Sequence, residues 1–218
     1  MTKLILIRHG QTEWNITGRY QGQSDVALSE EGIRQAELLA AHFPADHLDA
    51  VYTSDLQRAV DTARRVADRF DCQVQPDAEL REINFGQWEG LTYDQIAAQW
   101  PDEIGNFFTR PDILQIPQGE GFVALQQRVV KRVRELAALH DDHTIALVAH
   151  GAILRTILAA ALHMPLRYLW SLRQDNTAVN ILRYEDGHCL VELMNSTAHL
   201  SGAVFSARDV QDAMRSER

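Results

Sequence analysis

The sequence is poor in cysteine and contains no long apolar run. Its 218 residues include only Cys72 and Cys189, which are too far apart in the sequence to form a CxxC motif. We interpret them as two buried, small apolar side chains in a reducing compartment. The apolar run Leu4–Ile7 is too short for a signal peptide core, and no stretch reaches the roughly 20 apolar residues of a membrane-spanning helix. These absences predict a cytoplasmic protein without disulfides or a membrane anchor.

The chain also lacks an excess of basic residues. It contains 21 Lys and Arg against 30 Asp and Glu, which gives a formal net charge of −9 at pH 7. This balance excludes general binding to nucleic acids or anionic membranes, because both require basic surfaces. The hydrophobic fraction of 45% is that of an ordinary globular protein. We expect one domain over residues 1–200 and a polar C-terminal tail over residues 201–218.

Short apolar segments alternate with amphipathic segments along the chain. Strands are predicted at Lys3–Ile7, Ala50–Thr53, Cys72–Val74, Thr144–Ala149, Ala178–Arg183 and Cys189–Met194, the last two joined by a turn at Asp186-Gly187. Between them we expect a loop at Gly10–Ser24 and helices that begin near Ser29, Ser54, Glu120 and Ala152. This order predicts an α/β three-layer sandwich: a mostly parallel central sheet with an antiparallel edge strand and helices on both faces.

The region from about residue 83 to 117 is less regular than the rest. Short helices are expected around Gln95–Trp100 and Glu103–Phe107, forming a small helical cap over the carboxyl ends of the strands. Between residues 88 and 108 the region contains five aromatic residues: Trp88, Tyr93, Trp100, Phe107 and Phe108. We interpret most of them as the core of the cap, and the sequence leaves open whether one or two face a pocket.

Reactive side chains follow three of the predicted strands. The first strand ends in Arg8-His9, the second runs into Ser54 and Arg58, and the fourth ends in His150-Gly151. Ligands of open α/β sheets bind at the carboxyl ends of the strands, so these groups are expected at one rim. Their occurrence together favours a functional site over isolated structural roles.

Two histidines with two arginines suit phosphoryl transfer better than metal binding. Guanidinium groups match phosphate oxygens bidentately, and a neutral imidazole is a competent nucleophile at pH 7. His9 and His150 could also ligate a metal, but Arg8 and Arg58 would repel a divalent cation and no third ligand is evident. We therefore expect a phosphohistidine mechanism that needs neither a metal nor an organic cofactor.

Five sequence blocks in this order resemble one known family. They are Leu4–Asn15 with its Arg8-His9-Gly10 core, Leu28–Gly32, Thr53–Ala59, Leu80–Ile83 and Val148–Gly151. Together they resemble the histidine phosphatase superfamily, in the branch that holds cofactor-dependent phosphoglycerate mutases and small-molecule phosphatases.

The resemblance implies a role for each matched residue. His9 is the nucleophile that becomes phosphorylated, and Arg8, Arg58 and His150 surround the phosphoryl group and stabilise its charge. Glu82 is the general acid and base: it protonates the leaving alkoxide and then deprotonates the attacking water. Further contacts to the substrate or pocket are implied for Asn15, Gln21, Gly22, Ser54 and Gly151.

Residues 83–117 favour a phosphatase over a mutase. Residues 83–117 contain one cation, Arg110, and so lack the basic insertion expected of a mutase. Residues 86–93 look like those of α-ribazole phosphatases and broad-specificity phosphatases, although Gly121 stands where many such relatives have serine. The prediction is therefore a hydrolase of small-molecule phosphate monoesters, with α-ribazole 5′-phosphate, phosphoserine or a sugar-acid phosphate as candidate substrates. A phosphoglycerate mutase and a non-catalytic phospho-ligand binding module are the alternatives, and a homodimer is left open.

The acidic net charge does not conflict with an anionic substrate. Residues 25–103 carry a net charge of −11 and the rest of the chain +2. Repulsion beyond ~10 Å is screened by salt, so short-range contacts to arginine can dominate.

Overall fold

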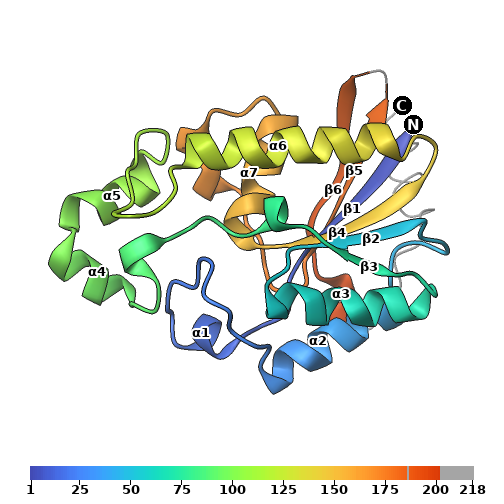
Figure 1. The fold of residues 1–218 in the computed structure, drawn as a ribbon, viewed down its shortest axis with the longest axis horizontal. Helices are drawn as coiled ribbons and strands as arrows, with labels where there is room; N and C mark the ends of the chain where they lie inside the picture. Colours follow the sequence, from blue (N-terminus) through green and yellow to red (C-terminus); the bar gives the residue numbers. More distant parts are fainter. Residues whose placement is uncertain (186, 202–218) are drawn as a thin grey trace.

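The computed structural model describes residues 1–185 and 187–201, and their arrangement is set by one six-stranded sheet (Figure 1). Its strands, in the order β3-β2-β4-β1-β5-β6, are β1 (Thr2–Arg8), β2 (Ala50–Thr53), β3 (Val74–Pro76), β4 (Thr144–Ala149), β5 (Val179–Glu185) and β6 (His188–Ser196). The neighbours β3-β2-β4-β1 are parallel. β5 runs antiparallel to β1 and β6 antiparallel to β5, which gives the sheet its expected antiparallel edge.

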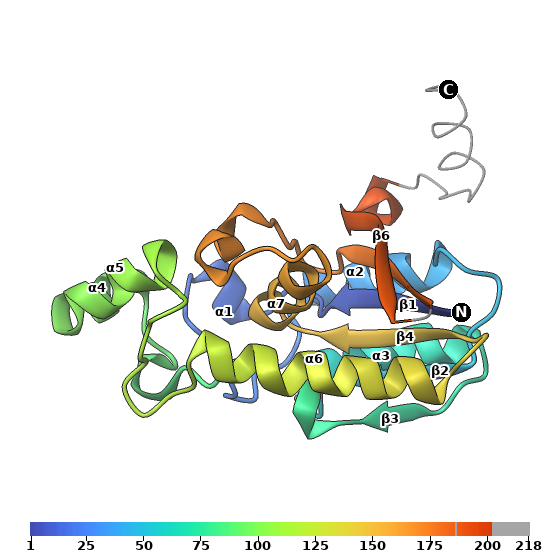
Figure 2. The same ribbon diagram turned by 90° about the horizontal axis from the view of Figure 1, so that it is seen from above.

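Helices cover both faces of the sheet, which confirms the three-layer α/β prediction (Figure 2). Alternate side chains of β1 divide between two cores because successive residues of a strand point to opposite faces. Leu4 and Leu6 pack in the core with α6 (Phe122–Leu139) and α7 (Gly151–Ala161). On the other face, Ile5 and Ile7 pack in the core with α2 (Glu30–Ala41) and α3 (Gln57–Arg69).

Two short helices lie beyond the carboxyl ends of β1 and β4. They are α4 (Tyr93–Gln99) and α5 (Pro101–Thr109), which lie side by side at one end of the molecule (Figures 1 and 2). Both helices were expected from the sequence within residues 83–117. The remaining short elements are α1 (Glu13–Ile16), η1 (Ala78–Leu80), η2 (Gly86–Trp88), η3 (Leu166–Ser171) and η4 (Ala198–Ser201).

The structure corrects several predicted boundaries. The expected loop at Gly10–Ser24 contains α1, whose first turn is closed by a capping box between Thr12 and Asn15. The third strand begins at Val74, because the Cys72 amide still bonds to the carbonyl of Ala67 and extends the turn that ends α3. That helix itself begins at Gln57, later than Ser54, and α6 begins at Phe122.

The two cysteines are less buried than the sequence suggested. Both are free and only half-buried: Cys72 follows α3, and Cys189 lies on the edge strand β6. Cys72 is held by a hydrogen bond from its Sγ to the carbonyl of Leu48 at 3.1 Å. Two other predictions fall partly outside the described residues: the Asp186-Gly187 turn, of which Gly187 alone is described, and the 201–218 tail, of which only Ser201 is. None of the helices within residues 1–185 and 187–201 is both long and apolar enough to cross a bilayer.

Candidate active site

The parallel strands bring the two predicted histidines together. β1 ends at Arg8 and β4 at Ala149, and these two residues are paired in the sheet register. The residues that follow the two strands, His9 and His150, therefore lie at the same edge of the sheet. The rings of His9 and His150 lie with their centroids 5.1 Å apart and their planes at 57°. The sheet register thus places an imidazole pair where ligands of such sheets bind.

The hydrogen bonding of His9 fixes which nitrogen can react. Its side chain is 3% exposed, and Nδ1 lies 2.7 Å from the carbonyl oxygen of Gly10. A carbonyl only accepts, so Nδ1 carries the proton and Nε2 keeps its lone pair. Burial, followed by the charges of Arg58 and Arg8, holds the pKa of His9 well below 6.5. His9 is therefore a neutral imidazole with a free Nε2 at neutral pH.

Two guanidinium groups approach His9 without a carboxylate partner. Arg58 is fully buried and donates from Nη1 to Ser24 O at 2.8 Å and from Nη2 to Gly22 O at 2.7 Å. Arg8 donates from Nη1 to Gln174 O at 2.6 Å. Within the described residues, neither arginine forms an ion pair, and the buried Nε of each has no hydrogen-bond partner. Burial lowers the pKa of Arg58 to about 10. Two cations without an ion pair, each with a buried Nε–H that has no acceptor, favour an anionic ligand.

His150, like Arg58, is fully enclosed in the site. Its side chain is fully buried, and neither ring nitrogen has a hydrogen-bond partner among the described residues. Burial, then the charges of Arg58 and Arg8, keeps the pKa of His150 well below 6.5. A neutral ring without partners can rotate its N–H toward a phosphate oxygen.

Glu82 is held at the N-terminus of α7. Its Oε2 accepts from Ala152 N at 3.0 Å, and its Oε1 accepts from Ile153 N at 3.2 Å and from Ile83 N at 3.0 Å. The amides of Ala152 and Ile153 are among those that a helix leaves without internal partners, so the side chain of Glu82 caps α7. The sequence identified Glu82 through a motif, but it gave no sign of this cap.

A cavity of about 200 Å³ joins most of these groups. Seven of the predicted residues line it: Arg8, His9, Asn15, Gln21, Gly22, Arg58 and Glu82. Four more lining residues were not assigned from the sequence: Gly18, Arg19, Tyr20 and Phe85. Arg19 and Tyr20 directly precede Gln21 and Gly22 in the same turn. The sequence could therefore have identified them as lining residues through that turn.

Three predicted residues lie outside the lining of this cavity. His150 is absent from the lining, although its ring lies against that of His9. Ser54 is fully buried, and its Oγ accepts from Leu56 N at 3.3 Å at the start of α3. Gly151 begins α7, and its carbonyl accepts from Arg155 Nη1 at 3.1 Å. Burial and the nearby Arg8 lower the pKa of Arg155 to about 10, which makes Arg155 a third cation of this region.

The five aromatic residues between 88 and 108 do not line the cavity. Trp88 and Phe107 are buried, Trp100 is half-buried, and Tyr93 and Phe108 are exposed. Tyr20 and Phe85 form the aromatic wall instead, with ring centroids 5.1 Å apart. Tyr20 also packs edge-on against Trp88 and Phe107 at 6.1 and 5.6 Å, so these rings support the wall from behind.

A polar network fixes the loop that carries Asn15 and Gln21. Thr12 donates to Gln21 Oε1 at 3.0 Å and receives the amide of Asn15 at 3.2 Å. Asn176, which the sequence did not identify, donates to Asn15 Oδ1 at 3.2 Å and to the His9 carbonyl at 3.1 Å. The loop and the nucleophile are therefore tied to the same side chain.

Gly22 lies at the edge of the cavity, where its carbonyl accepts a hydrogen bond from Arg58. Its φ is +52°, and a Cβ there would lie 2.2 Å from Glu89 Oε1 and 3.0 Å from Phe85 N. Glu89 cannot simply move away, because it accepts from Gln23 N at 2.8 Å and Ser24 Oγ at 2.6 Å.

Gly22→Ala is expected to weaken both stability and phosphate binding. The left-handed backbone alone costs about 1–2 kcal/mol, and the clash displaces the carbonyl that holds Arg58. Gly18→Ala is the matched control: its φ is +66°, but nothing lies within 4 Å of its Cβ. Urea unfolding and the Kd for inorganic phosphate measure the two effects. Equal phosphate affinities for the two variants would contradict this role for Gly22.

The buried histidines predict a pH-dependent stability. The unfolded chain binds protons at His150 near pH 6.5, whereas the folded chain does not, because its pKa is lowered. The free energy of unfolding should therefore fall as the pH drops below 6.5, by at most about 1.4 kcal/mol per pH unit for each such histidine. Urea unfolding between pH 7.5 and 5 should show a shallower fall for His150→Asn than for the native chain. The same slope in both proteins would refute the expectation.

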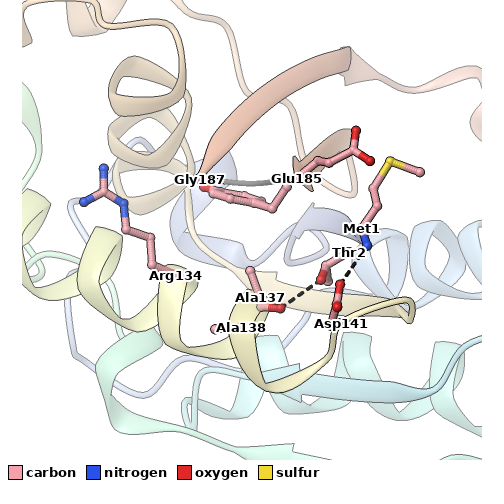
Figure 3. A pocket seen from close by; sticks show the side chains of 9 residues that line it. Met1, Thr2, Arg134, Ala137, Ala138, Asp141, Glu185 and Gly187 are labelled. Carbon is pink, nitrogen blue, oxygen red and sulfur yellow. Dashed lines mark hydrogen bonds and ion pairs between the residues drawn. The ribbon is translucent and has the colours of Figure 1, made fainter.

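A larger cavity lies at the opposite end of β1 (Figure 3). It measures about 750 Å³ and is lined by Met1, Thr2, Arg134, Ala137, Ala138, Asp141, Tyr184, Glu185 and Gly187. The amino group of Met1 pairs with Asp141 at 2.7 Å, and Thr2 donates to the carbonyl of Ala137. The length of β1 separates it from His9 by roughly 20 Å. None of the residues predicted for catalysis lies there.

Metal-ligating side chains do not gather in the described part of the chain. Residues 1–185 and 187–201 contain no group of three or more His, Cys, Asp or Glu side chains arranged to hold an ion. At the rim, the two imidazoles stand beside Arg8 and Arg58, and Glu82 is the one acidic residue among the described residues that line the cavity.

Comparisons with known proteins give a consistent result. The family model described as "Histidine phosphatase superfamily (branch 1)" matches residues 4–197. Phosphoserine phosphatase 1 from Hydrogenobacter thermophilus is 32% identical over 200 residues, which cover 92% of this chain and 95% of the relative. YhfR from Bacillus stearothermophilus has a TM-score of 0.88 and 35% identity, covering 92% of this chain and all of that one.

Other similar proteins carry different activity names. A phosphoserine phosphatase mutant from Entamoeba histolytica, solved in complex with phosphoserine, has a TM-score of 0.84 and 32% identity, covering 92% of this chain and 100% of its own. An adenosylcobalamin/alpha-ribazole phosphatase from Salmonella typhimurium is 31% identical, and the match covers 90% of this chain and 97% of that protein. A probable phosphoglycerate mutase from Proteus mirabilis is 32% identical, and the match covers 92% of this chain and 96% of that protein. Relatives at this identity therefore differ in their named substrate.

Proposed function

Because this chain belongs to branch 1 of the histidine phosphatase superfamily and is a phosphomonoesterase of that family, we propose that it works through a phosphohistidine on His9, with Glu82 as general acid and base. The free Nε2 of His9 supports the first role. The position of Glu82 on the same cavity supports the second.

In the first step, Nε2 of His9 attacks the phosphorus of the monoester. The bond from phosphorus to the ester oxygen breaks, and protonated Glu82 gives its proton to the departing oxygen. The Nδ1–H···O=C bond to Gly10 stabilises the positive charge that develops on the imidazole ring. The alcohol then leaves, and the phosphoryl group remains on His9.

In the second step, water replaces the alcohol. Glu82, now a carboxylate, takes a proton from the water as its oxygen attacks phosphorus and the N–P bond breaks. Inorganic phosphate leaves, and His9 returns to its neutral state. One carboxyl group thus serves both steps in opposite directions.

The observation that carries the proposal is the pair of guanidiniums without an ion-pair partner, that of Arg58 fully buried and that of Arg8 half-buried. Arg58 and Arg8 each keep an unpartnered buried Nε–H beside His9. A phosphoryl group in transfer spreads negative charge over its equatorial oxygens, and fixed donors stabilise this charge without reorganisation. The neutral His150 adds a further donor on the same side.

Hydrolysis is favoured over the mutase reaction because residues 83–117 bring no unpaired cation to the cavity. Only Phe85 of that region lines the cavity, and its single cation, Arg110, is paired with Asp112 at 3.1 Å. A mutase must hold a sugar-acid monophosphate firmly enough for it to accept the phosphoryl group again. Without basic residues from this region, water is the better acceptor.

All five core residues, His9, Arg8, Arg58, Glu82 and His150, are present, which argues against the binding-module alternative.

For the substrate, we propose a compact phosphate monoester of the phosphoserine type. The cavity of about 200 Å³ is smaller than the 300–1,000 Å³ typical of pockets for larger ligands. Relatives named phosphoserine phosphatase support the same class. A bulky nucleotide-like leaving group, such as that of α-ribazole 5′-phosphate, would extend past Tyr20 and Phe85 into solvent.

A phosphate-release panel tests this proposal. It compares kcat/KM for phosphoserine, 3-phosphoglycerate, α-ribazole 5′-phosphate and 4-nitrophenyl phosphate, alongside an assay for interconversion of 2- and 3-phosphoglycerate. Phosphoserine is expected to exceed α-ribazole 5′-phosphate in kcat/KM. The opposite order would overturn the substrate class, and a dominant mutase signal would overturn the phosphatase assignment to this site.

A further inference from the structure

Glu82 lies in an irregular segment that is anchored to α6 from outside the cavity. Arg128 of α6 donates from Nη1 to the carbonyl of Glu79 at 2.5 Å and to that of Arg81 at 3.1 Å. The Arg81 carbonyl belongs to the peptide bond that leads into Glu82. The guanidinium of Arg128 therefore holds the backbone directly before the proposed proton donor.

Glu120 holds the same segment on its other side. Its carboxylate receives Arg128 in a two-pronged pair, Nε to Oε1 at 3.1 Å and Nη2 to Oε2 at 2.9 Å. Both side chains are mostly buried, with 19% and 18% exposed. The backbone amide of Glu120 also donates to the carbonyl of Asn84 at 2.8 Å. The pair thus fixes the chain before and after Glu82.

We propose that Arg128 and Glu120 are positioning residues for proton transfer by Glu82, an inference that rests on the acid–base role proposed above. The carboxylate of Glu82 must reach the amides of α7 and the cavity at once, so small shifts of its backbone move it away from the leaving oxygen. Misplacement of a reacting group by about 1 Å can cost about 100-fold in rate. Arg128 is suited to the task because one planar guanidinium satisfies two carbonyls and two carboxylate oxygens together.

A purely structural ion pair is the competing interpretation, and α6 carries a matched control. Arg132, one turn after Arg128, pairs with Asp77 at 2.5 Å and so binds the same segment at the start of η1. It makes no hydrogen bond to residues 79–84 among the described contacts. Its loss should disturb the segment without acting on the peptide that precedes Glu82.

Leaving groups of different acidity separate the two interpretations. An alkyl phosphate such as phosphoserine needs protonation of its leaving oxygen, whereas 4-nitrophenolate leaves without it. The quantity kcat/KM reports the first irreversible step, formation of phosphohistidine, for both substrates. Arg128→Lys is expected to lower kcat/KM for phosphoserine by about tenfold to 100-fold. For 4-nitrophenyl phosphate the loss should stay below about threefold, because proton transfer contributes little there.

The controls assign each outcome to one hypothesis. Arg132→Lys should change both substrates equally and slightly. Equal losses on both substrates for Arg128→Lys would overturn the positioning role. Glu82→Gln is measured in the same assay: if it lacks the preference for the aryl substrate, the acid–base proposal itself fails. If Glu82→Gln shows that preference and Arg128→Lys does not, only the positioning inference fails. Should Arg128→Lys fold poorly by circular dichroism, Glu120→Gln replaces it under the same criteria.

Discussion

His9→Ala is expected to abolish turnover, with a loss in kcat of roughly 10⁴-fold or more, the scale on which removal of a nucleophile acts in covalent catalysts. Among the described residues, His9 is the histidine that lines the cavity, and its Nε2 is free to attack; His150 lies against its ring and is proposed as a donor to the phosphoryl group. Without His9 the phosphoryl group has no acceptor on the protein. Phosphate release from phosphoserine and 4-nitrophenyl phosphate measures the effect.

The loss should be chemical and not a loss of binding. Arg8 and Arg58 remain in the His9→Ala variant, so its affinity for inorganic phosphate is expected to stay within a few-fold of the native value. His47→Ala is the control, since His47 is exposed and pairs with Asp49 at the amino end of β2. It should leave turnover unchanged. Near-normal phosphate release by His9→Ala would refute the phosphohistidine mechanism.

Glu82→Gln is expected to slow the reaction of alkyl phosphates by roughly 10²- to 10³-fold in kcat/KM, within the range found for general acid–base residues. The amide cannot donate the proton in the first step or accept it in the second. The amide oxygen of glutamine can still accept a hydrogen bond from one of the two α7 amides that donate to Glu82. The NH2 group cannot accept from the other, because both groups are donors. A modest loss of stability, about 1–3 kcal/mol, should accompany the change.

Binding and chemistry can be separated for this variant as well. Affinity for inorganic phosphate should be nearly retained, because Glu82 is an acid and not a phosphate-binding cation. Glu79→Gln is a suitable control, since Glu79 is an exposed acid of the same segment. If Glu82→Gln matched the native enzyme on phosphoserine, another group would have to transfer the proton.

The sheet and the two histidines were predictable because their signals are local. An apolar run such as Leu4–Ile7 is recognisable as a buried strand, and Arg8-His9 follows it directly. The same holds for β4 and His150. Once the strands are taken as parallel, the physics of the sheet places their ends at one rim. The predicted boundaries of β2 and β4 agree with the structure residue for residue.

Contacts between distant loops could not be predicted in the same way. Asn176 reaches His9 and Asn15 across more than 160 positions, through a loop whose own residues carry no periodic pattern. Arg128 looks like any exposed position of an amphipathic helix until its carbonyl partners are known. The sequence likewise left open whether one or two of the five aromatic residues at 88–108 face a pocket. None of them lines the cavity, and Tyr20 and Phe85 form its aromatic wall, because which ring faces the cavity depends on packing between elements.

Trapping the phosphoryl group on His9 tests the account most directly. With 4-nitrophenyl phosphate, Glu82→Gln should form phosphohistidine readily but hydrolyse it slowly, since only the second step then needs the carboxylate. Rapid mixing should release one equivalent of 4-nitrophenol per enzyme in a burst. Mass spectrometry after an alkaline quench should find one phosphoryl group on the peptide that contains His9. A burst with no label on His9, or full turnover with the label on another residue, would contradict the mechanism proposed for this site.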